Sequence, residues 1–436
     1  MDNAGGRDLD VIAGQVAARL LERAHLVAPD EIANSVVEAA RPLGITGARI
    51  YLADLQQRTL RLVAGHGAAR ELTIDSTLAG RAYRTVSMYY GPAEGGSGWR
   101  VWLPLIGGTE RLGVLELHCS DVSEPMRAQF RMIASLAGLM VASKTEFSDA
   151  LAAGRRSGSM ALQAELVWGF LVPRTFATDQ VLVAAMLEPA YEVGGDAFDY
   201  SLAAGRLDVS IFDGAGHDLE AGLIASVGMA ACRRTRRAGG TLAEMTSYAD
   251  DAIARQFGDS RFLTALLAEL DVTTGQFSWI PCGHPPPLLI RDSKTVKELT
   301  RAPRLPLGLA SLDAIAADGL WSPGGPPADN DAWVYTERLQ PRDRILLYTD
   351  GITDGRSPDG TPFGLDRLAD YVIRHSNAGI SAHETLRRLN HAIVEYQHER
   401  LSDDATIVLV EWMPDHPEDM LISPANGGGT STGVPR

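Results

Sequence analysis

Apolar residues near the start of the chain recur every three or four positions, the spacing that places side chains on one face of an α-helix. This pattern predicts a helix over residues 1–25 and a second helix that begins after Pro29. Beyond Leu43 the pattern changes to short alternating runs between polar turns, which is typical of β-strands. Strands are expected at residues 48–52, 60–64, 101–106 and 112–118, and a short helix at 77–84. The order of these elements predicts a compact α+β domain over residues 28–145, preceded by an N-terminal helix over 1–27.

From Pro125 the helical spacing returns and continues to Pro173, with interruptions at Gly154 and Gly158. We therefore expect a connecting helix over residues 125–173, which overlaps the end of the first domain. Periodicity alone leaves two roles open, a passive spacer and a dimerising rod that carries a signal. The spacer is favoured because no a/d seam extends over three or four heptads.

Strand-like runs dominate residues 174–412, with a few helical stretches among them. The helical stretches are 221–236, 241–256, 365–374 and 383–398. This order predicts a second α+β domain, in which sheet packs on sheet and the helices lie outside. Residues 413–436 are rich in Pro, Gly, Ser and Thr, so we expect a disordered tail.

Composition narrows the classes of function. The formal net charge is −15 in 436 residues, and the one basic run, at 233–237, suits the C-terminal turn of a helix. We therefore expect no nucleic-acid partner. Cys119, Cys232 and Cys282 are far apart, which argues against a cysteine metal site and favours a reducing compartment. Without a signal-peptide pattern or a run of about 18 apolar residues, we expect a cytoplasmic protein with no membrane contact.

Four aspartates stand at the ends of apolar strands. Asp196 closes the run Glu-Val-Gly-Gly-Asp, Asp213 and Asp350 each precede a glycine, and Asp403 precedes a long apolar run. Taken singly, each is explained as well by a turn or a helix cap. Taken together they predict a site for a hard divalent cation, because converging carboxylates repel one another and glycines let the backbone approach a ligand.

Eight short motifs, each weak by itself, follow one another along residues 174–412. They are Glu188-Pro-Ala-Tyr-Glu-Val-Gly-Gly-Asp-Ala-Phe-Asp-Tyr200, Phe212-Asp-Gly-Ala-Gly-His217, Phe262-Leu-Thr-Ala-Leu266, Cys282-Gly-His-Pro-Pro286, Leu305-Pro-Leu-Gly308, Leu347-Tyr-Thr-Asp-Gly-Ile-Thr-Asp354, Pro362-Phe-Gly364 and Asp403-Asp-Ala-Thr406. In this order they resemble the metal-dependent protein serine/threonine phosphatases of the PPM family, in the bacterial SpoIIE/RsbU-like branch.

The resemblance implies an αββα sandwich with two Mn²⁺ or Mg²⁺ ions. By position, Asp196 and Asp213 would hold the ions, the Gly214 carbonyl would bind one of them, and Asp350 and Asp403 would complete the site. The same four aspartates would form the catalytic set. Two such cations depress the pKa of a shared water and neutralise phosphoryl oxygens, so no covalent nucleophile is required.

Other polar residues in these motifs leave alternatives open. Asp404 stands where the family often has Asn, and we expect it behind the ligands. His217 either protonates the leaving serine oxygen or only packs at its turn, and packing is favoured. His284 is interpreted as structural in the same way. Thr349 and Thr353 are expected to bond only the backbone of the metal loop.

Two departures from the family pattern stand out. Asp218 occupies a position that the family usually fills with a small residue, and it would add a carboxylate near the site. This carboxylate would alter metal affinity or the entry of a phosphorylated substrate. The stretch 310–331 is long and rich in Gly and Pro, and is either a mobile flap over the substrate or a tolerated surface loop.

Residues 28–145 resemble a GAF sensor domain. The motifs that carry the resemblance are Ile50-Tyr-Leu-Ala-Asp54, Leu78-Ala-Gly-Arg-Ala82, Leu103-Pro-Leu105 and Leu112-Gly-Val-Leu115. The resemblance implies an α/β/α domain that binds an unknown small ligand or protein, and the fold alone does not identify that ligand.

The sequence thus predicts a sensor-regulated, metal-dependent phosphatase for phosphoserine and phosphothreonine on a regulatory protein. In this branch such substrates are often STAS-type anti-sigma-factor antagonists. We expect a homodimer in which the helix over 125–172 transmits the state of the sensor. Two alternatives remain, an inactive binding module of the same fold and a hydrolase of small phosphate esters. The intact aspartates argue against the first, and an open glycine-rich site is compatible with the second.

Overall fold

The computed structural model describes residues 3–63, 71–93, 98–216, 218–258, 261–292, 294–309, 333–398 and 401–414. The chain divides into two compact units between Ser157 and Gly158. Unit 1 precedes this boundary and unit 2 follows it, and each has its own buried core. His217, the stretch 310–331 and the expected tail from residue 415 onward lie outside the described residues.

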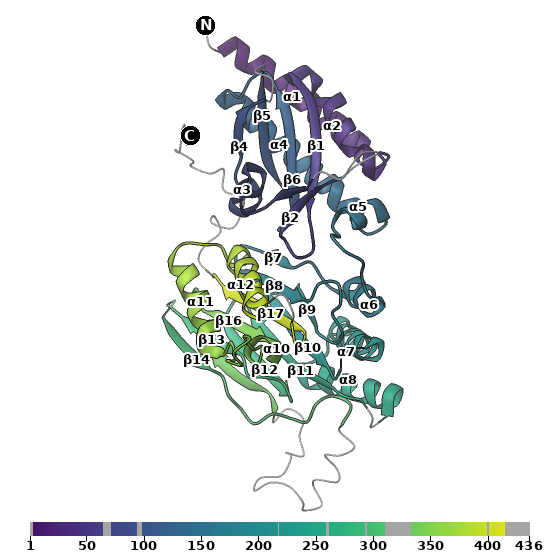
Figure 1. Cartoon of the computed structure of the whole chain (residues 1–436), viewed down its shortest axis with the longest axis vertical. Coiled ribbons are helices and arrows are strands. Elements are labelled where there is room, and N and C mark those ends of the chain that lie inside the picture. The colour runs from purple at the N-terminus through teal and green to yellow at the C-terminus, as the bar shows by residue number, and fades with distance from the viewer. Residues whose placement is uncertain are drawn as a thin grey trace, which may run out of the picture. The chain divides into compact units, whose positions relative to one another are not determined.

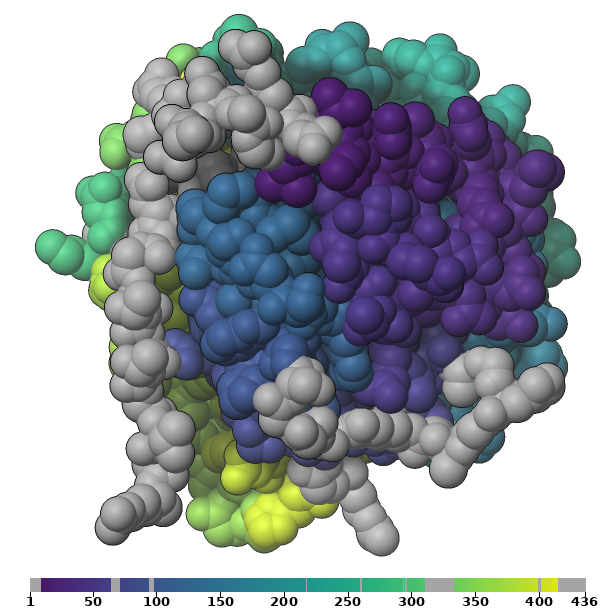
Figure 2. Space-filling view, turned by 90° about the horizontal axis from the view of Figure 1, so that it is seen from above, coloured from purple at the N-terminus to yellow at the C-terminus, as the bar shows by residue number. Residues whose placement is uncertain are grey.

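Unit 1 is built on one six-stranded antiparallel sheet with the order β3-β2-β1-β6-β5-β4. Its strands are β1 (Ile45–Ala53), β2 (Thr59–Leu62), β3 (Glu71–Thr73), β4 (Tyr89–Pro92), β5 (Trp99–Gly107) and β6 (Glu110–Cys119). Its helices are α1 (Asn3–Ala24), α2 (Ile32–Ala40), α3 (Leu78–Thr85), α4 (Glu124–Thr145) and α5 (Asp149–Gly154). Figure 2 shows α1 and α2, in purple, on the outer surface of this unit.

Alternation along the strands separates the two faces of this sheet. Leu103 and Leu115 pair across β5 and β6 and belong to the core that α1, α2 and α4 cover. Trp102 and Val114 point the other way, into a smaller cluster with Tyr83 of α3. Helices therefore lie on both faces of the sheet, which is the layering expected of the first domain.

The single connecting helix expected over 125–173 is not present. Three helices cover this stretch, α4, α5 and α6 (Leu162–Phe170), and the Ser148 side chain caps the N-terminus of α5. The apolar positions belong to two different cores, because Phe130 is fully buried in unit 1 whereas Val167 is fully buried in unit 2. The periodicity that joined them in the sequence therefore comes from separate helices.

Unit 2 contains two antiparallel sheets, with the orders β15-β12-β11-β10-β9 and β14-β13-β16-β17-β8-β7. The strands of the first are β9 (Ala197–Ala203), β10 (Arg206–Gly214), β11 (Leu263–Asp271), β12 (Gln276–Cys282) and β15 (Tyr335–Arg338). Those of the second are β7 (Thr175–Ala177), β8 (Val181–Glu188), β13 (Leu288–Arg291), β14 (Thr295–Glu298), β16 (Arg344–Tyr348) and β17 (Ala405–Trp412).

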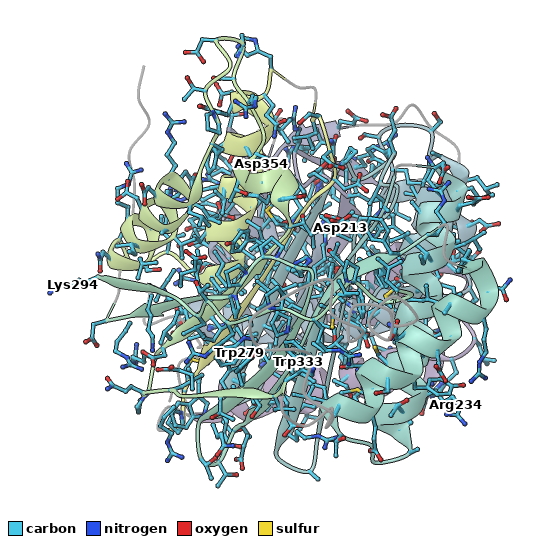
Figure 3. All side chains as sticks on the ribbon, turned by 90° about the horizontal axis from the view of Figure 1, so that it is seen from below. Asp213, Arg234, Trp279, Lys294, Trp333 and Asp354 are labelled. Carbon is cyan, nitrogen blue, oxygen red and sulfur yellow. The ribbon has the colours of Figure 1, made fainter. Side chains whose placement is uncertain are left out.

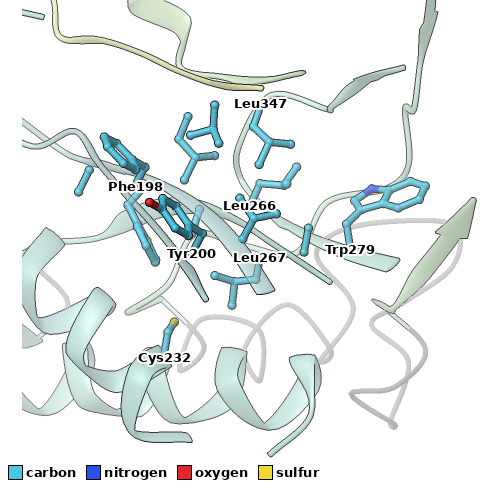
Figure 4. Packing of buried hydrophobic residues seen from close by; sticks show 14 of the residues in the cluster. Phe198, Tyr200, Cys232, Leu266, Leu267, Trp279 and Leu347 are labelled. Atoms are coloured by element: carbon cyan, nitrogen blue, oxygen red, sulfur yellow. The ribbon is translucent and has the colours of Figure 1, made fainter. Parts of the chain in front are cut away.

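The two sheets pack face to face and helices cover their outer faces (Figure 1). Helices α7 (Leu219–Arg237) and α8 (Leu242–Phe257) cover the five-stranded sheet, and α11 (Leu365–Asn377) and α12 (Ala382–Tyr396) cover the other. Figure 4 shows Leu266 on the face of β11 toward Leu347 of the second sheet, whereas Leu267 points toward the helix that carries Cys232. The expected αββα sandwich is thereby confirmed. Within the described part of the chain, no helix has both the length and the apolar character needed to cross a lipid bilayer.

One buried carboxylate makes the stability of unit 2 dependent on pH. Asp208 lies in β10, is 2% exposed, and contacts the Arg206 guanidinium at 3.4 Å. Burial raises its pKa to about 6. Because this folded-state pKa exceeds that of an unfolded aspartate, the contribution of Asp208 to stability is complete below about pH 4 and is lost as the pH rises through 6.

We expect Asp208→Asn to remove this loss. Relative to the variant, the wild type should lose up to about 3 kcal/mol of unfolding free energy between pH 4 and pH 7, measured by urea denaturation. Asp271→Asn is the matched control, because the half-buried Asp271 caps a turn by accepting from the Thr273 and Thr274 amides, and these hydrogen bonds lower its pKa. Its effect should appear only at low pH. A difference between wild type and Asp208→Asn that is the same at both pH values would contradict this account.

Candidate functional site

One edge of the unit 2 sandwich collects the ends of several strands. Strand β16 ends opposite the start of β17, where Tyr348 pairs with Ile407, and β17 starts opposite the end of β8, where Ala405 pairs with Glu188. Asp350 follows β16 after one residue, Thr349, and is the first residue of the short helix α10 (Asp350–Thr353). The loop with Asp403 and Asp404 directly precedes β17. Strand pairing therefore brings these aspartates to the same edge of the six-stranded sheet.

The other sheet contributes Asp213 at the end of β10 and Asp196 just before β9, where Phe212 pairs with Ala197. Residues 189–196, which we name the crossing link, lead from β8 in one sheet to β9 in the other. In Figure 3, Asp213 lies toward the same side of the sandwich as Asp354 of the 350–354 segment, and Trp279 lies toward the opposite side. All four predicted aspartates are thus placed at this edge.

The carboxylate of Asp404 holds the crossing link in place. Its Oδ2 accepts hydrogen bonds from three successive backbone amides, those of Gly194 at 2.7 Å, Gly195 at 2.8 Å and Asp196 at 3.3 Å. Asp404 is 8% exposed, so this oxygen points inward rather than toward solvent. Such a row of amides is a backbone site for an anion. Asp404 therefore positions the segment that carries Asp196, as expected for a residue behind the ligands.

Asp196 is itself oriented by Thr349. The Thr349 hydroxyl donates to Asp196 Oδ2 at 2.8 Å and accepts a hydrogen bond from the Thr406 amide at 2.9 Å. The expectation that Thr349 bonds only backbone is therefore wrong, because its hydroxyl reaches the carboxylate. Thr353 does behave as expected, since its hydroxyl donates to the Asp350 carbonyl at 3.3 Å.

The carboxylates at this edge disfavour one another's ionised forms. Burial, followed by the charges of Asp404 and Asp213, raises the pKa of Asp196 well above its usual range. Burial and the charges of Asp350, Asp403 and Asp404 raise the pKa of Asp213 to about 7. Partial desolvation of its carboxylate, followed by the charges of Asp403 and Asp354, raises the pKa of Asp350, although this residue is exposed. Mutual repulsion of this kind is relieved when a cation binds among the carboxylates.

The donor set suits a hard divalent cation. Carboxylate and backbone carbonyl oxygens are the ligands that Mg²⁺ and Mn²⁺ prefer, and here they come from separate loops. Among the described residues, no three His, Cys, Asp or Glu side chains already converge as ligands around one point. The candidate cation site is therefore argued from the chemistry of the donor atoms and from the mutual repulsion of the carboxylates.

Glycines allow the loops at this edge to approach one another. A Cβ atom added to Gly195 would lie 2.2 Å from the Gly214 carbonyl oxygen, and one added to Gly351 would lie 1.9 Å from the Asp404 carbonyl oxygen. Any larger residue would force the backbones apart. The Gly214 carbonyl consequently lies against the crossing link next to Asp196, where a backbone ligand is expected.

His284 links two strands through hydrogen bonds at both ring nitrogens. Its Nε2 donates to the Tyr348 carbonyl at 3.1 Å, and its Nδ1 accepts from the Thr264 hydroxyl at 2.9 Å. Burial lowers its pKa to about 3, so the ring is neutral at ordinary pH and can accept at Nδ1. Both ring nitrogens are occupied by bonds that join β11 to β16, in line with the structural interpretation.

Asp218 is not an additional carboxylate of the site. Its Oδ1 caps α7 by accepting from the Ala221 amide at 3.0 Å, and its Oδ2 pairs with Arg261 at 3.0 Å. The hydrogen bond from Ala221 is the main reason that the pKa of Asp218 is lowered. Arg261 also donates to the Ala215 carbonyl at 3.0 Å, so the pair supports the loop that follows Asp213.

The sequence analysis assigned no role to two acidic groups near the site. The first is Asp354, which stands in one of the eight motifs and whose charge raises the pKa of Asp350. Glu188 is 2% exposed, accepts from Asn390 of α12 at 2.9 Å, and accepts from the Ala190 amide at 2.9 Å. A glutamate at the end of an apolar strand was the available signal for this second group.

Comparison with known proteins gives one family and several relatives. Residues 203–413 match the family model described as Stage II sporulation protein E (SpoIIE). Protein IcfG from Synechocystis sp. is 27% identical over 130 residues, which are 30% of this chain and 18% of that protein. Phosphoserine phosphatase RsbU from Bacillus subtilis is 22% identical over 242 residues, which are 56% of this chain and 65% of that protein. The chain thus spans less than two thirds of either relative.

Solved structures give similar matches. The structure of the RsbU and RsbW domains of a Mycobacterium tuberculosis protein is 24% identical, covers 54% of this chain and 62% of that one, and has a TM-score of 0.44. The SiaA-PP2C domain of Pseudomonas aeruginosa is 24% identical, covers 52% of this chain and 85% of that one, and has a TM-score of 0.41.

Substitutions at Asp404 and at its neighbour Asp403 test whether the three hydrogen bonds to Asp404 hold the crossing link in place. We expect Asp404→Ala to lower the unfolding free energy by about 3 kcal/mol, because three amides lose a charged acceptor. Asp403→Ala should cost less than about 1 kcal/mol, because Asp403 is exposed and its side chain accepts one backbone amide, that of Asp404, within the described part of the chain. Urea unfolding in EDTA measures both values without bound metal. Equal losses in the two variants would contradict the role given to Asp404.

Proposed function

We propose that unit 2 is a metal-dependent protein serine/threonine phosphatase of the PPM family, on the premise that residues 203–413 match the SpoIIE family model. The observation that carries the proposal is the set of mutually repelling carboxylates at one edge of the sandwich. Asp196, Asp213, Asp350 and Asp403 would serve as ligands, together with the Gly214 carbonyl. The cations would be two Mn²⁺ or Mg²⁺ ions.

Such ions, when bound, supply a water of lowered pKa and neutralise the phosphoryl oxygens. The chain's own residues prepare the site for them. Asp404 fixes the crossing link, and Thr349 turns the Asp196 carboxylate toward the edge. Positioning of this kind lowers the cost of reorganisation during the reaction.

The uneven burial of the ligands supports a protein substrate. Asp196 is 2% exposed, whereas Asp350 and Asp403 lie on the surface. A site that opens to solvent at its outer ligands is accessible to a phosphorylated side chain on a folded partner. We propose a phosphorylated regulatory protein as substrate, with STAS-type anti-sigma-factor antagonists as the class that the family resemblance favours.

Unit 1 would act as the sensor of this enzyme. Two observations support this sensor role. Unit 1 has a central antiparallel sheet with α3 on one face and α1, α2 and α4 on the other, and its sequence contains the GAF-like motifs. Its ligand would be a small molecule or a protein. We also propose a cytoplasmic homodimer. Helix α4 contributes buried residues to the core of unit 1, so a continuous helix over 125–172 is not the basis of this dimer.

Hydrolysis of p-nitrophenyl phosphate and of a phosphoserine protein tests the proposed function. We expect activity with Mn²⁺ that falls about 100-fold or more when EDTA is added or when Asp350→Asn removes one ligand charge. Asp271→Asn is the control and should keep its activity, because Asp271 is a half-buried turn aspartate at the end of β11.

The two substrates separate the alternatives. Turnover of p-nitrophenyl phosphate without turnover of any phosphoprotein would favour a hydrolase of small esters. Equal rates for wild type, Asp350→Asn and EDTA-treated enzyme would exclude metal-dependent catalysis at this edge.

A further inference from the structure

Asp404 holds the end of the crossing link, and a second set of contacts holds its beginning. The side chain of Trp168 in α6 donates its indole N–H to the Ala190 carbonyl at 2.7 Å. The amide of Ala161, the residue that precedes α6, donates to the Tyr191 carbonyl at 2.8 Å. Both acceptors belong to the crossing link, so α6 binds the same segment that ends in Asp196.

The backbone of Ala190 is held at both its amide and its carbonyl group. Its amide donates to the buried Glu188 carboxylate at 2.9 Å, and its carbonyl accepts from Trp168. Ala190 is fully buried, so a missing partner on either side would leave a buried polar group unsatisfied. The position of the link at this point therefore depends on the indole as well as on Glu188.

Helix α6 is a firm support for these contacts. Ala164 and Val167 are fully buried on the side of α6 that packs against α7, which lies next to it in Figure 1. A Cβ atom added to Gly222 of α7 would lie 3.3 Å from Gln163 Cβ and 3.2 Å from the Gly194 carbonyl oxygen. Helix α6, helix α7 and the crossing link therefore meet closely at one place.

The end of α6 is tied down as well. The Phe170 carbonyl accepts from Arg233 at 2.6 Å, and Arg233 pairs with Asp199 at 2.7 Å. Asp199 is 1% exposed in β9, the strand that Asp196 precedes. The helix that carries Trp168 is thus anchored to strand β9 as well as to the link.

We propose that Trp168 is a positioning residue for the metal site: its indole N–H, acting through the Ala190 carbonyl, sets the place of Asp196 and thereby the affinity for a divalent cation. This proposal rests on the proposed function, because it takes Asp196 as a ligand. Trp168 touches neither substrate nor metal. It lies before residue 203, where the family match begins, so the site depends on a helix outside the matched region.

The test is calorimetric titration of the metal-free full chain with MnCl₂. Trp168→Phe keeps a six-membered aromatic ring and removes the five-membered ring with its N–H donor. We expect it to weaken Mn²⁺ binding about 10-fold, which is the scale of an outer hydrogen bond at a metal site. At saturating Mn²⁺ the turnover number should stay within about 3-fold of the wild type, because bound metal restores the position of Asp196.

Trp412→Phe is the matched control. Its indole donates to the Val272 carbonyl at 2.7 Å, the same length as the bond of Trp168, and its ring is 5% exposed. Trp412 is the last residue of β17, at the far end of the strand from Asp404. Its loss should affect stability similarly and leave Mn²⁺ affinity unchanged.

Ala161→Pro provides a second variant if Trp168→Phe fails to fold. Ala161 has φ −69° and ψ 155°, values that proline accepts, and the substitution replaces the N–H that donates to Tyr191 with a ring carbon. Weaker Mn²⁺ binding in Trp168→Phe or Ala161→Pro, but not in Trp412→Phe, supports the proposal. Wild-type affinity in both variants overturns it if Asp196→Asn still abolishes binding. A wild-type chain that binds no Mn²⁺ overturns the proposed function instead.

Discussion

The fold of unit 2 has to place like charges side by side, and the Asp404 carboxylate makes this possible. It is buried, and three amides of the crossing link share one of its oxygens. These amides would otherwise be buried without partners, which folded proteins rarely tolerate. The same contacts bring Asp196 to the edge where Asp213 and Asp350 already lie. The hydrogen bonds that stabilise the crossing link thus also hold the carboxylates close together, against their mutual repulsion.

Burial divides the site into an inner and an outer part. The inner part is rigid, because Asp196 is bonded by Thr349, and the link that carries it is held by Asp404 at one end and by Glu188 and Trp168 at the other. The outer part, Asp350 and Asp403, faces solvent. A rigid inner ligand preorganises the site, and accessible outer ligands allow a bulky phosphorylated partner to approach. This division suits the proposed reaction better than an enclosed pocket would.

The sequence was informative where local chemistry determines structure. Asp-Gly after an apolar run marked Asp213 and Asp350, because only glycine permits the close approach of backbones seen at Gly351. It was uninformative where distant partners decide. The periodicity around Phe130 and Val167 suggested one helix, since nothing local shows that the two side chains belong to different cores. The contact between Thr349 and Asp196 joins residues 153 positions apart. Asp218 pairs with Arg261, 43 positions away, and this partner explains why its carboxylate is not part of the site.

In the proposed function, Asp196, Asp213, Asp350 and Asp403 surround divalent cations at one edge of the sandwich. Anomalous diffraction from crystals grown with Mn²⁺ tests it most directly. We expect two peaks about 3.5–4 Å apart, bounded by these four carboxylates and the Gly214 carbonyl oxygen. The absence of any peak at this edge at saturating Mn²⁺, or peaks only elsewhere on the chain, would contradict it.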